Sequence, residues 1–192
     1  MGNFEFEMEP LRADRLRGYR GVVGPFGSVD VFSVLCVPGQ DPSRQAQLQG
    51  DQFPETLFSG GAGVLPSLDG GWLKVDGSLV DMELKVKGVR KGSRWLELTY
   101  RERHYTYVSG GDFKEARLHR EKATVTMGRG RHVPRTGGTR IGKAEGDVDA
   151  TDLAIVLVLE KVDKSALTTS GALLAVPMNF LFGRQRDEGD LA

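Results

Sequence analysis

The sequence predicts a mainly β protein with a minor α component (α+β), built as an antiparallel sheet or barrel-like sandwich with long Gly-rich loops. Short runs alternate strictly between apolar and polar residues, which is typical of half-buried strands. The 26 glycines are about twice the usual share of roughly 7% and indicate many turns. One apolar run near the C-terminal end follows residues that can cap a helix. At 192 residues the chain can bury one core, so we expect a single β-rich domain over residues 1–192.

Two strands are expected in the N-terminal part. Phe4, Phe6 and Met8 alternate with glutamates and so share one face of a strand, which Pro10 is expected to end. Residues 29–37 are rich in Val and Phe and lie between Gly- and Pro-containing turns, which predicts a second strand that is buried on most sides.

Residues 39–71 contain many Gly, Pro and Gln residues and show little sustained periodicity. They are predicted to form a long loop. Loops of this length in a compact domain either carry function or become ordered when a partner binds, and a passive surface loop is the alternative.

The clearest pattern is a strand pair. Met82, Leu84 and Val86 alternate with charged residues, and a second alternating run covers residues 95–101. The polar segment between them, Gly88 to Arg94, has the length of a hairpin connection. Further strands are expected at residues 105–108 and 123–127, so the centre of the protein is predicted to be an antiparallel sheet.

The C-terminal part leaves two interpretations open. Thr151 or Asp152 could cap a helix over residues 153–162, whereas the β-branched residues Ile155, Val156 and Val158 favour a buried strand. We favour the helix. A last strand is expected at residues 172–182, followed by a flexible charged tail at 184–192.

One segment resembles a phosphate-binding loop. Residues Gly137 to Lys143 fit the GxxxxGK frame, but the next residue is Ala144 where that loop has the Ser or Thr that binds magnesium. The Arg-rich segment before it is not an apolar strand, and the residues after it do not start a helix convincingly. Nucleotide hydrolysis is therefore not indicated.

No other segment has the residue pattern of a metal-binding or catalytic site. His104, His119 and His132 lack the i, i+4 spacing of paired helical ligands, and the single Cys36 has no basic partner nearby. Acidic pairs such as Glu5/Glu7 and Asp147/Asp149 are interpreted as solvated faces, and no serine lies in a nucleophile elbow. We therefore predict no enzyme, no catalytic residue, no cofactor and no cofactor- or metal-binding residue.

Charge is unevenly distributed, although the formal net charge is zero. Residues 101–143 hold eight Arg and three Lys against four acidic residues, whereas residues 144–192 hold four basic and nine acidic residues. The basic segment 129–135, with Tyr105, Tyr107 or Trp95 as stacking rings, could bind nucleic acid. The zero net charge and the acidic C-terminal part argue against nucleic acid as the partner. We favour docking of the basic segment against an acidic neighbour, including another copy.

We expect a soluble protein without a membrane span. The N-terminus lacks the basic start and apolar stretch of a signal peptide. The longest apolar runs, 153–159 and 172–178, are far below the roughly 18 residues that a membrane-spanning helix needs.

Residues 75–108 resemble a segment of minor tail or hub-type (tail tip) proteins of long-tailed bacteriophages. In that family a Val-Arg-Lys turn is followed by Leu-x-Leu-Thr, an aromatic residue and an acidic-basic pair. The counterparts in this chain are Val89-Arg90-Lys91, Leu96-Glu97-Leu98-Thr99, Tyr100 and Glu102-Arg103. The similarity covers about thirty-five residues. It departs at Arg101, where an acidic residue is usual, and downstream, where a Gly/Arg loop replaces an Arg-rich helix.

The resemblance implies a structural, non-enzymatic virion protein that is a β-rich oligomer. It would be a subunit of a viral tail tip or hub, assembled in the host cytoplasm, whose partners are other copies of itself and other virion tail proteins. The alternative is a small lipocalin-like or dirigent-like β-barrel that binds or guides a small apolar ligand, and would otherwise be cytoplasmic.

Overall fold

Twelve strands make up most of the part of the chain that the structure describes. The computed structural model describes residues 2–13, 16–34, 45–60, 65–87, 94–110, 114–133 and 137–168. The strands are β1 (Phe4–Ala13), β2 (Leu16–Val22), β3 (Ser28–Val34), β4 (Gln45–Gln49), β5 (Thr56–Gly60), β6 (Gly71–Val75), β7 (Ser78–Val86), β8 (Arg94–Tyr100), β9 (Arg103–Ser109), β10 (Ala116–Arg120), β11 (Ala123–Val133) and β12 (Gly137–Gly146).

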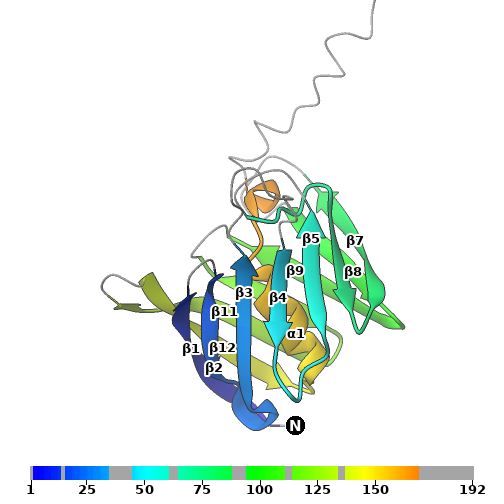
Figure 1. Cartoon of the computed structure of the whole chain (residues 1–192). Helices are drawn as coiled ribbons and strands as arrows, with labels where there is room; N and C mark the ends of the chain where they lie inside the picture. The colour runs from blue at the N-terminus through cyan, green and yellow to red at the C-terminus, as the bar shows by residue number, and fades with distance from the viewer. Residues whose placement is uncertain are drawn as a thin grey trace, which may run out of the picture.

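The strands form one closed, antiparallel, up-and-down barrel (Figure 1). Each strand pairs with the strand before and after it in the chain. The barrel closes where β1 pairs with β12, with Phe4 opposite Ala144 and Met8 opposite Arg140. The predicted mainly β, antiparallel, barrel-like fold is therefore confirmed, and β7 and β8 pair as expected, with Leu84 opposite Leu96. The apolar face predicted for β7 is only partly buried, because Leu84 and Val86 are 42% and 52% exposed.

Alternation along each strand separates the interior of the barrel from its outer surface. On β8, Leu96, Leu98 and Tyr100 are buried, whereas the side chains between them face outward. Since successive side chains of a strand point to opposite faces, the apolar-polar period of two in the sequence becomes an apolar lining and a polar exterior.

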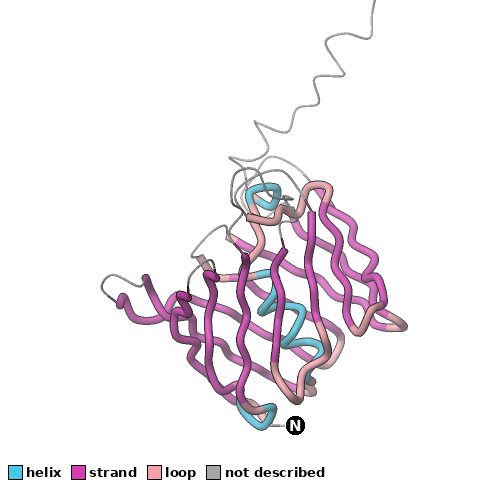
Figure 2. Tube along the Cα trace, in the orientation of Figure 1, coloured by secondary structure: helices cyan, strands magenta, loops and turns pink. Residues whose placement is uncertain are grey.

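The one α-helix among the described residues, α1 (Ala150–Leu159), lies inside the barrel (Figure 2). Every residue from Asp152 to Leu159 is buried, and the helix contacts β3, β4, β5, β10 and β11. A helix that is apolar all round must be enclosed on all sides. A twelve-stranded barrel is wider than the eight-stranded kind that side chains alone can fill, so a helix about 10 Å across fits within it.

The helix begins at the lower end of the barrel in Figure 1, near the 3₁₀ turn that joins β2 to β3. The 3₁₀ turn η1 (Gly24–Phe26) places Phe26 between Phe4 and Phe53, with ring centroids 6.3 Å and 6.1 Å apart. The second 3₁₀ turn, η2 (Ser165–Leu167), follows the helix at the upper end.

Three predictions about local structure were wrong. β1 does not end at Pro10 but continues to Ala13, because its pairing with β12 stops at Met8 and a strand edge tolerates a residue without an N–H group. Residues 39–71 are not one long loop, because β4 and β5 lie within them. The helix cap is Asp149, not Thr151 or Asp152, although the choice of helix over strand was right.

Several predictions lie outside the described residues. These are Cys36, the connection at residues 88–93, the strand at 172–182 and the charged tail at 184–192. Within the described ranges, no helix has both the length and the apolar character needed to cross a membrane.

Candidate functional site

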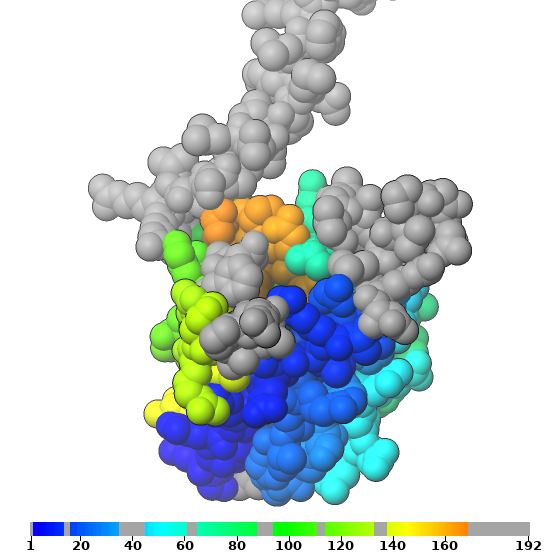
Figure 3. Space-filling model, turned by 60° about the vertical axis from the view of Figure 1, so that its left-hand side comes forward, coloured from blue at the N-terminus to red at the C-terminus, as the bar shows by residue number. Residues whose placement is uncertain are grey.

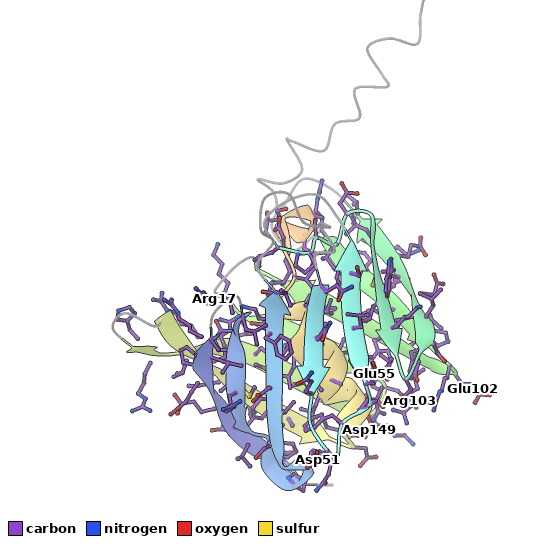
Figure 4. The ribbon with its side chains drawn as sticks, in the orientation of Figure 1. Arg17, Asp51, Glu55, Glu102, Arg103 and Asp149 are labelled. Atoms are coloured by element: carbon purple, nitrogen blue, oxygen red, sulfur yellow. The ribbon has the colours of Figure 1, made fainter. Side chains whose placement is uncertain are left out.

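Charged side chains gather at three places: the lower end of the helix, its upper end, and the outer surface over β1 to β4. At the lower end, Arg103 and Arg120 from the barrel wall meet Asp149 and Asp152 from the start of α1; we call these four residues the lower-end cluster. Figure 4 labels Arg103 and Asp149, which lie side by side at this end.

The lower-end cluster fixes the start of the helix. Asp149 accepts backbone N–H groups of Thr151 and Asp152, and Asp152 accepts that of Asp149 in return, which is a capping box. Arg120 holds Asp152 with two parallel hydrogen bonds, Nε to Oδ1 and Nη2 to Oδ2, both at 2.9 Å. Hydrogen bonding to Asp152 raises the pKa of Arg120.

Little space remains in the lower-end cluster for a ligand. The cavity between Tyr105, Leu118 and Asp152 leaves about 0 Å³ that a water molecule could occupy, so it holds no water-sized space. Burial raises the pKa of the Tyr105 hydroxyl to about 12, so it stays protonated at neutral pH. Two guanidinium groups face two carboxylates here, and we interpret the lower-end cluster as structural.

The upper end of the helix carries a different set of charges. Glu160 at the end of α1 accepts hydrogen bonds from Arg140 of β12 and from Lys164, the latter at 2.9 Å between Nζ and Oε1. The side chains of all three are between 1% and 4% exposed. The side chain of Lys161 lies next to them, with its Nζ 5.2 Å from the centre of the Tyr19 ring. We call Arg140, Glu160, Lys161 and Lys164 the upper-end cluster.

The upper-end cluster holds three cationic side chains and one carboxylate. Burial, together with the positive charges of Lys164 and Arg140, lowers the pKa of Lys161 to about 8. A lysine with a pKa this close to neutrality is a feature of binding and catalytic sites more often than of surfaces.

The third place is a groove on the outside of the barrel, over β1 to β4. It has a volume of about 710 Å³; Figure 3 turns this face, with the first strands in blue, toward the viewer. We call it the outer groove. Its charged lining consists of four carboxylates and one guanidinium: Glu7, Glu9, Asp30, Asp51 and Arg20.

Two of these carboxylates already have partners. Arg20 binds Asp30 with two hydrogen bonds of 2.7 Å and 2.5 Å. Glu7 accepts a hydrogen bond of 2.6 Å from Thr139, which lowers its pKa. A second hollow of about 390 Å³ continues the groove past Gln49 and Asp51 toward β5.

The sequence-predicted residues are dispersed over the barrel. His104 and His119 lie on β9 and β10 and contact Thr99 and Thr124 of the neighbouring strands, at 3.1 Å and 2.9 Å. His132 lies on β11. Over the described residues, no three His, Cys, Asp or Glu side chains are grouped as metal ligands.

The GxxxxGK frame is strand β12, not a loop before a helix. Its Lys143 pairs with Glu145 at 2.9 Å on the surface, whereas its Arg140 points inward to Glu160. Of the rings proposed to stack on bases, Tyr105 and Tyr107 are buried in the core. Glu5 and Glu7, predicted as a solvated face, lie on the outer face of β1, and Asp149 has instead become the helix cap.

Sequence reasoning missed the upper-end cluster. Glu160 and Lys164 are four residues apart directly after an apolar run, which is the spacing of an ion pair on one helical turn. Arg140 could not be added from the sequence, because β12 faces the helix only once the barrel has closed.

Comparisons of the chain with models of protein families, with curated proteins and with solved structures found no match.

Proposed function

We propose that this protein is a non-enzymatic structural module that binds neighbouring protein chains through the outer surface of its barrel. The observation that carries the proposal is the position of α1. The helix occupies the interior that other barrels of this size leave open, so the surface available to a partner is the outside.

The outer groove is the binding surface that we propose. It combines carboxylates with the exposed side chain of Val22, which is 62% exposed, and with the amide side chain of Gln49. A mixture of charge, amide and isolated apolar groups is typical of interfaces that form between already folded proteins. The excess of carboxylates favours a partner that presents basic side chains.

The basic partner that the chain itself offers is the hairpin of β11 and β12. The residues of β12 that precede Arg140 pair with β11 alone, so the hairpin projects from the barrel, at the left of Figure 1. It exposes His132 and Arg131, whose side chain is 76% exposed and whose Nε lies 3.5 Å from Oε1 of Glu7 in the same chain. We infer that the hairpin of one copy docks in the outer groove of the next, a head-to-tail contact that builds a ring or a filament.

A tail tip or hub of a long-tailed bacteriophage is the narrower form of this proposal. Its support is the resemblance of residues 75–108, and with it come a virion location and other tail proteins as partners. The lipocalin-like or dirigent-like alternative has less support, because α1 stands where such a barrel holds its apolar ligand.

The native mass of the purified chain tests the proposal. We expect an oligomer by light scattering, and we expect Glu9→Lys with Asp51→Lys to convert it to monomers, since both side chains line the outer groove. The matched control, Asp81→Lys with Glu115→Lys, reverses two exposed charges on β7 and next to β10 and should leave the mass unchanged. A wild-type monomer that carries a small apolar molecule in native mass spectrometry would contradict the proposal and support the alternative.

A further inference from the structure

One edge of β7 is open in its upper half. β6 pairs with β7 only over residues 78–80, and among the described residues no other strand continues the ladder on that side. The upper ends of β7 and β8 lie at the right of Figure 1. A strand edge without a partner presents N–H and C=O groups that can pair with another chain.

The turn before β7 determines which backbone groups point to the open edge. Asp76-Gly77 is a two-residue hairpin turn, so Val75 and Ser78 on either side of it exchange hydrogen bonds. Such hydrogen-bonded pairs alternate along an antiparallel ladder. The residues of β7 whose N–H and C=O groups point to the open edge are therefore Met82, Leu84 and Val86.

The same residues carry apolar side chains that the barrel does not cover completely. Leu84 and Val86 lie on the inner face of the sheet, yet they are 42% and 52% exposed. Leu96, which lies opposite Leu84 on β8, is only 4% exposed. An exposed apolar strand edge is prone to pair with other chains, so the side chains and the backbone of β7 both indicate a partner strand.

The sequence of β7 is complementary to itself. If two β7 strands pair antiparallel about Leu84, Met82 of one copy lies opposite Val86 of the other, and Glu83 lies opposite Lys85. The apolar side chains then meet on one face of the sheet, and the carboxylate meets the ammonium group on the other. The side chains of Glu83 and Lys85 are 65% and 33% exposed, so a second copy can reach both.

Other registers fit less well. A pair centred on Met82 would need residues 78–80, which already pair with β6. A pair centred on Val86 would bring Lys85 of one copy against Lys87 of the other, and like charges directly opposite each other are destabilising.

We propose that β7 pairs with β7 of a second copy of this chain, antiparallel and about a two-fold axis at Leu84. This contact is isologous, whereas the contact of the hairpin with the outer groove is head-to-tail, so together they join two rings or two filaments. The inference rests on the proposed function. A ladder over residues 82–86 is small for a stable interface, and it holds copies firmly once the outer groove has linked several of them.

Light scattering of the full chain at a fixed concentration tests the β7 pair. Leu84→Lys places two ammonium groups at the two-fold axis and should lower the mass by about half, since two joined rings or filaments separate. The matched control is Val108→Lys on β9, because Val108 is an apolar residue with a similar exposure of 39%. This control should keep the wild-type mass.

A charge swap tests the register and guards against a folding defect. Glu83→Lys sets ammonium groups of the two copies opposite each other and should also lower the mass. Adding Lys85→Glu restores opposite charges between the copies, so the double variant should recover the wild-type mass. Circular dichroism checks that each variant is folded.

The failure of this inference is distinguishable from the failure of the proposed function. A wild-type mass in Leu84→Lys, or no recovery in the folded charge-swap variant, overturns the β7 pair and leaves the groove contact in place. An assembly that Glu9→Lys with Asp51→Lys leaves intact, but that Leu84→Lys divides, retains the β7 pair and rejects the groove contact. A wild-type monomer overturns both.

Discussion

The two ends of α1 differ in how their charges are balanced. At the lower end two guanidinium groups meet two carboxylates, and the hydrogen bonds of the helix cap complete the arrangement. At the upper end Arg140 and Lys164 share the carboxylate of Glu160, and all three side chains are at most 4% exposed. Removing one partner should therefore cost more at the upper end, because water can reach the charges of the lower end more easily.

The largest effect is expected from Glu160→Gln. The substitution leaves the buried charges of Arg140 and Lys164 without their carboxylate, which should lower the free energy of unfolding by about 3–5 kcal/mol. Urea denaturation measures it, with Glu115→Gln as the control because Glu115 pairs with Arg117 on the surface. A loss no larger than that of the control would mean that the upper end is not held by this ion pair.

Asp152→Ala should cost less, about 2–3 kcal/mol, although it removes both the Arg120 partner and one half of the capping box. The reason is that the side chain of Arg120 is 18% exposed and so can turn to water, whereas Arg140 cannot. If Asp152→Ala destabilised the protein more than Glu160→Gln, the contrast between the two ends would be reversed.

The third prediction concerns pH. The pKa of Lys161 is about 8 in the folded protein and is ordinarily 10.5, so between these values the unfolded chain binds more protons. Stability should therefore rise with pH, by about 2 kcal/mol between about pH 7.5 and about pH 9.5 from this group. Urea denaturation at both pH values should show the rise in the wild type and a smaller rise in Lys161→Met. The same slope in both proteins would show that Lys161 titrates normally.

The smallest effect is expected from Arg103→Gln at the lower end. Its side chain is 43% exposed and pairs with the partly exposed Asp149, so water screens the interaction and the loss should be about 1 kcal/mol or less. Thermal unfolding followed by circular dichroism is sufficient to measure it. A loss as large as that of Asp152→Ala would indicate that all four residues of the lower-end cluster act as one unit.

The strands that could be predicted were those with a clean period of two and clear turns. β7 and β8 satisfy both conditions. β4 and β5 were missed because each is short and lies near Gly and Pro residues. In β4 only Ala46 and Leu48 are apolar, and in β5 the outward Leu57 stands next to the buried Phe58, which breaks the period of two. The sequence did contain a signal for the strand after β5. Asp76-Gly77, both with positive φ, is a tight hairpin turn that joins β6 to β7, and this residue pair is typical of such turns.

The candidate sites could be predicted far less well. The outer groove depends on the curvature of four strands, and the upper-end cluster joins residues of β12 to residues that follow α1. Sequence periodicity reports which face of a strand is buried but not which strands face each other across a barrel. The helix could be predicted less well than the strands but better than the sites. Its apolar run indicated burial, whereas the reason that no face is polar, enclosure by the barrel, could not be read from the sequence.

The pairing of β1 with β12 also constrains how the chain folds. Thr139 hydrogen bonds to Glu7, 132 positions earlier in the sequence, so the first strand acquires its second neighbour after nearly all the others have been made. Until then the sheet has two open edges, which can pair with other chains. Folding should accordingly be slow, as is usual for proteins rich in contacts between distant residues. Because α1 follows β12 in the chain, a nascent chain that has not reached residue 159 lacks the helix that fills the barrel.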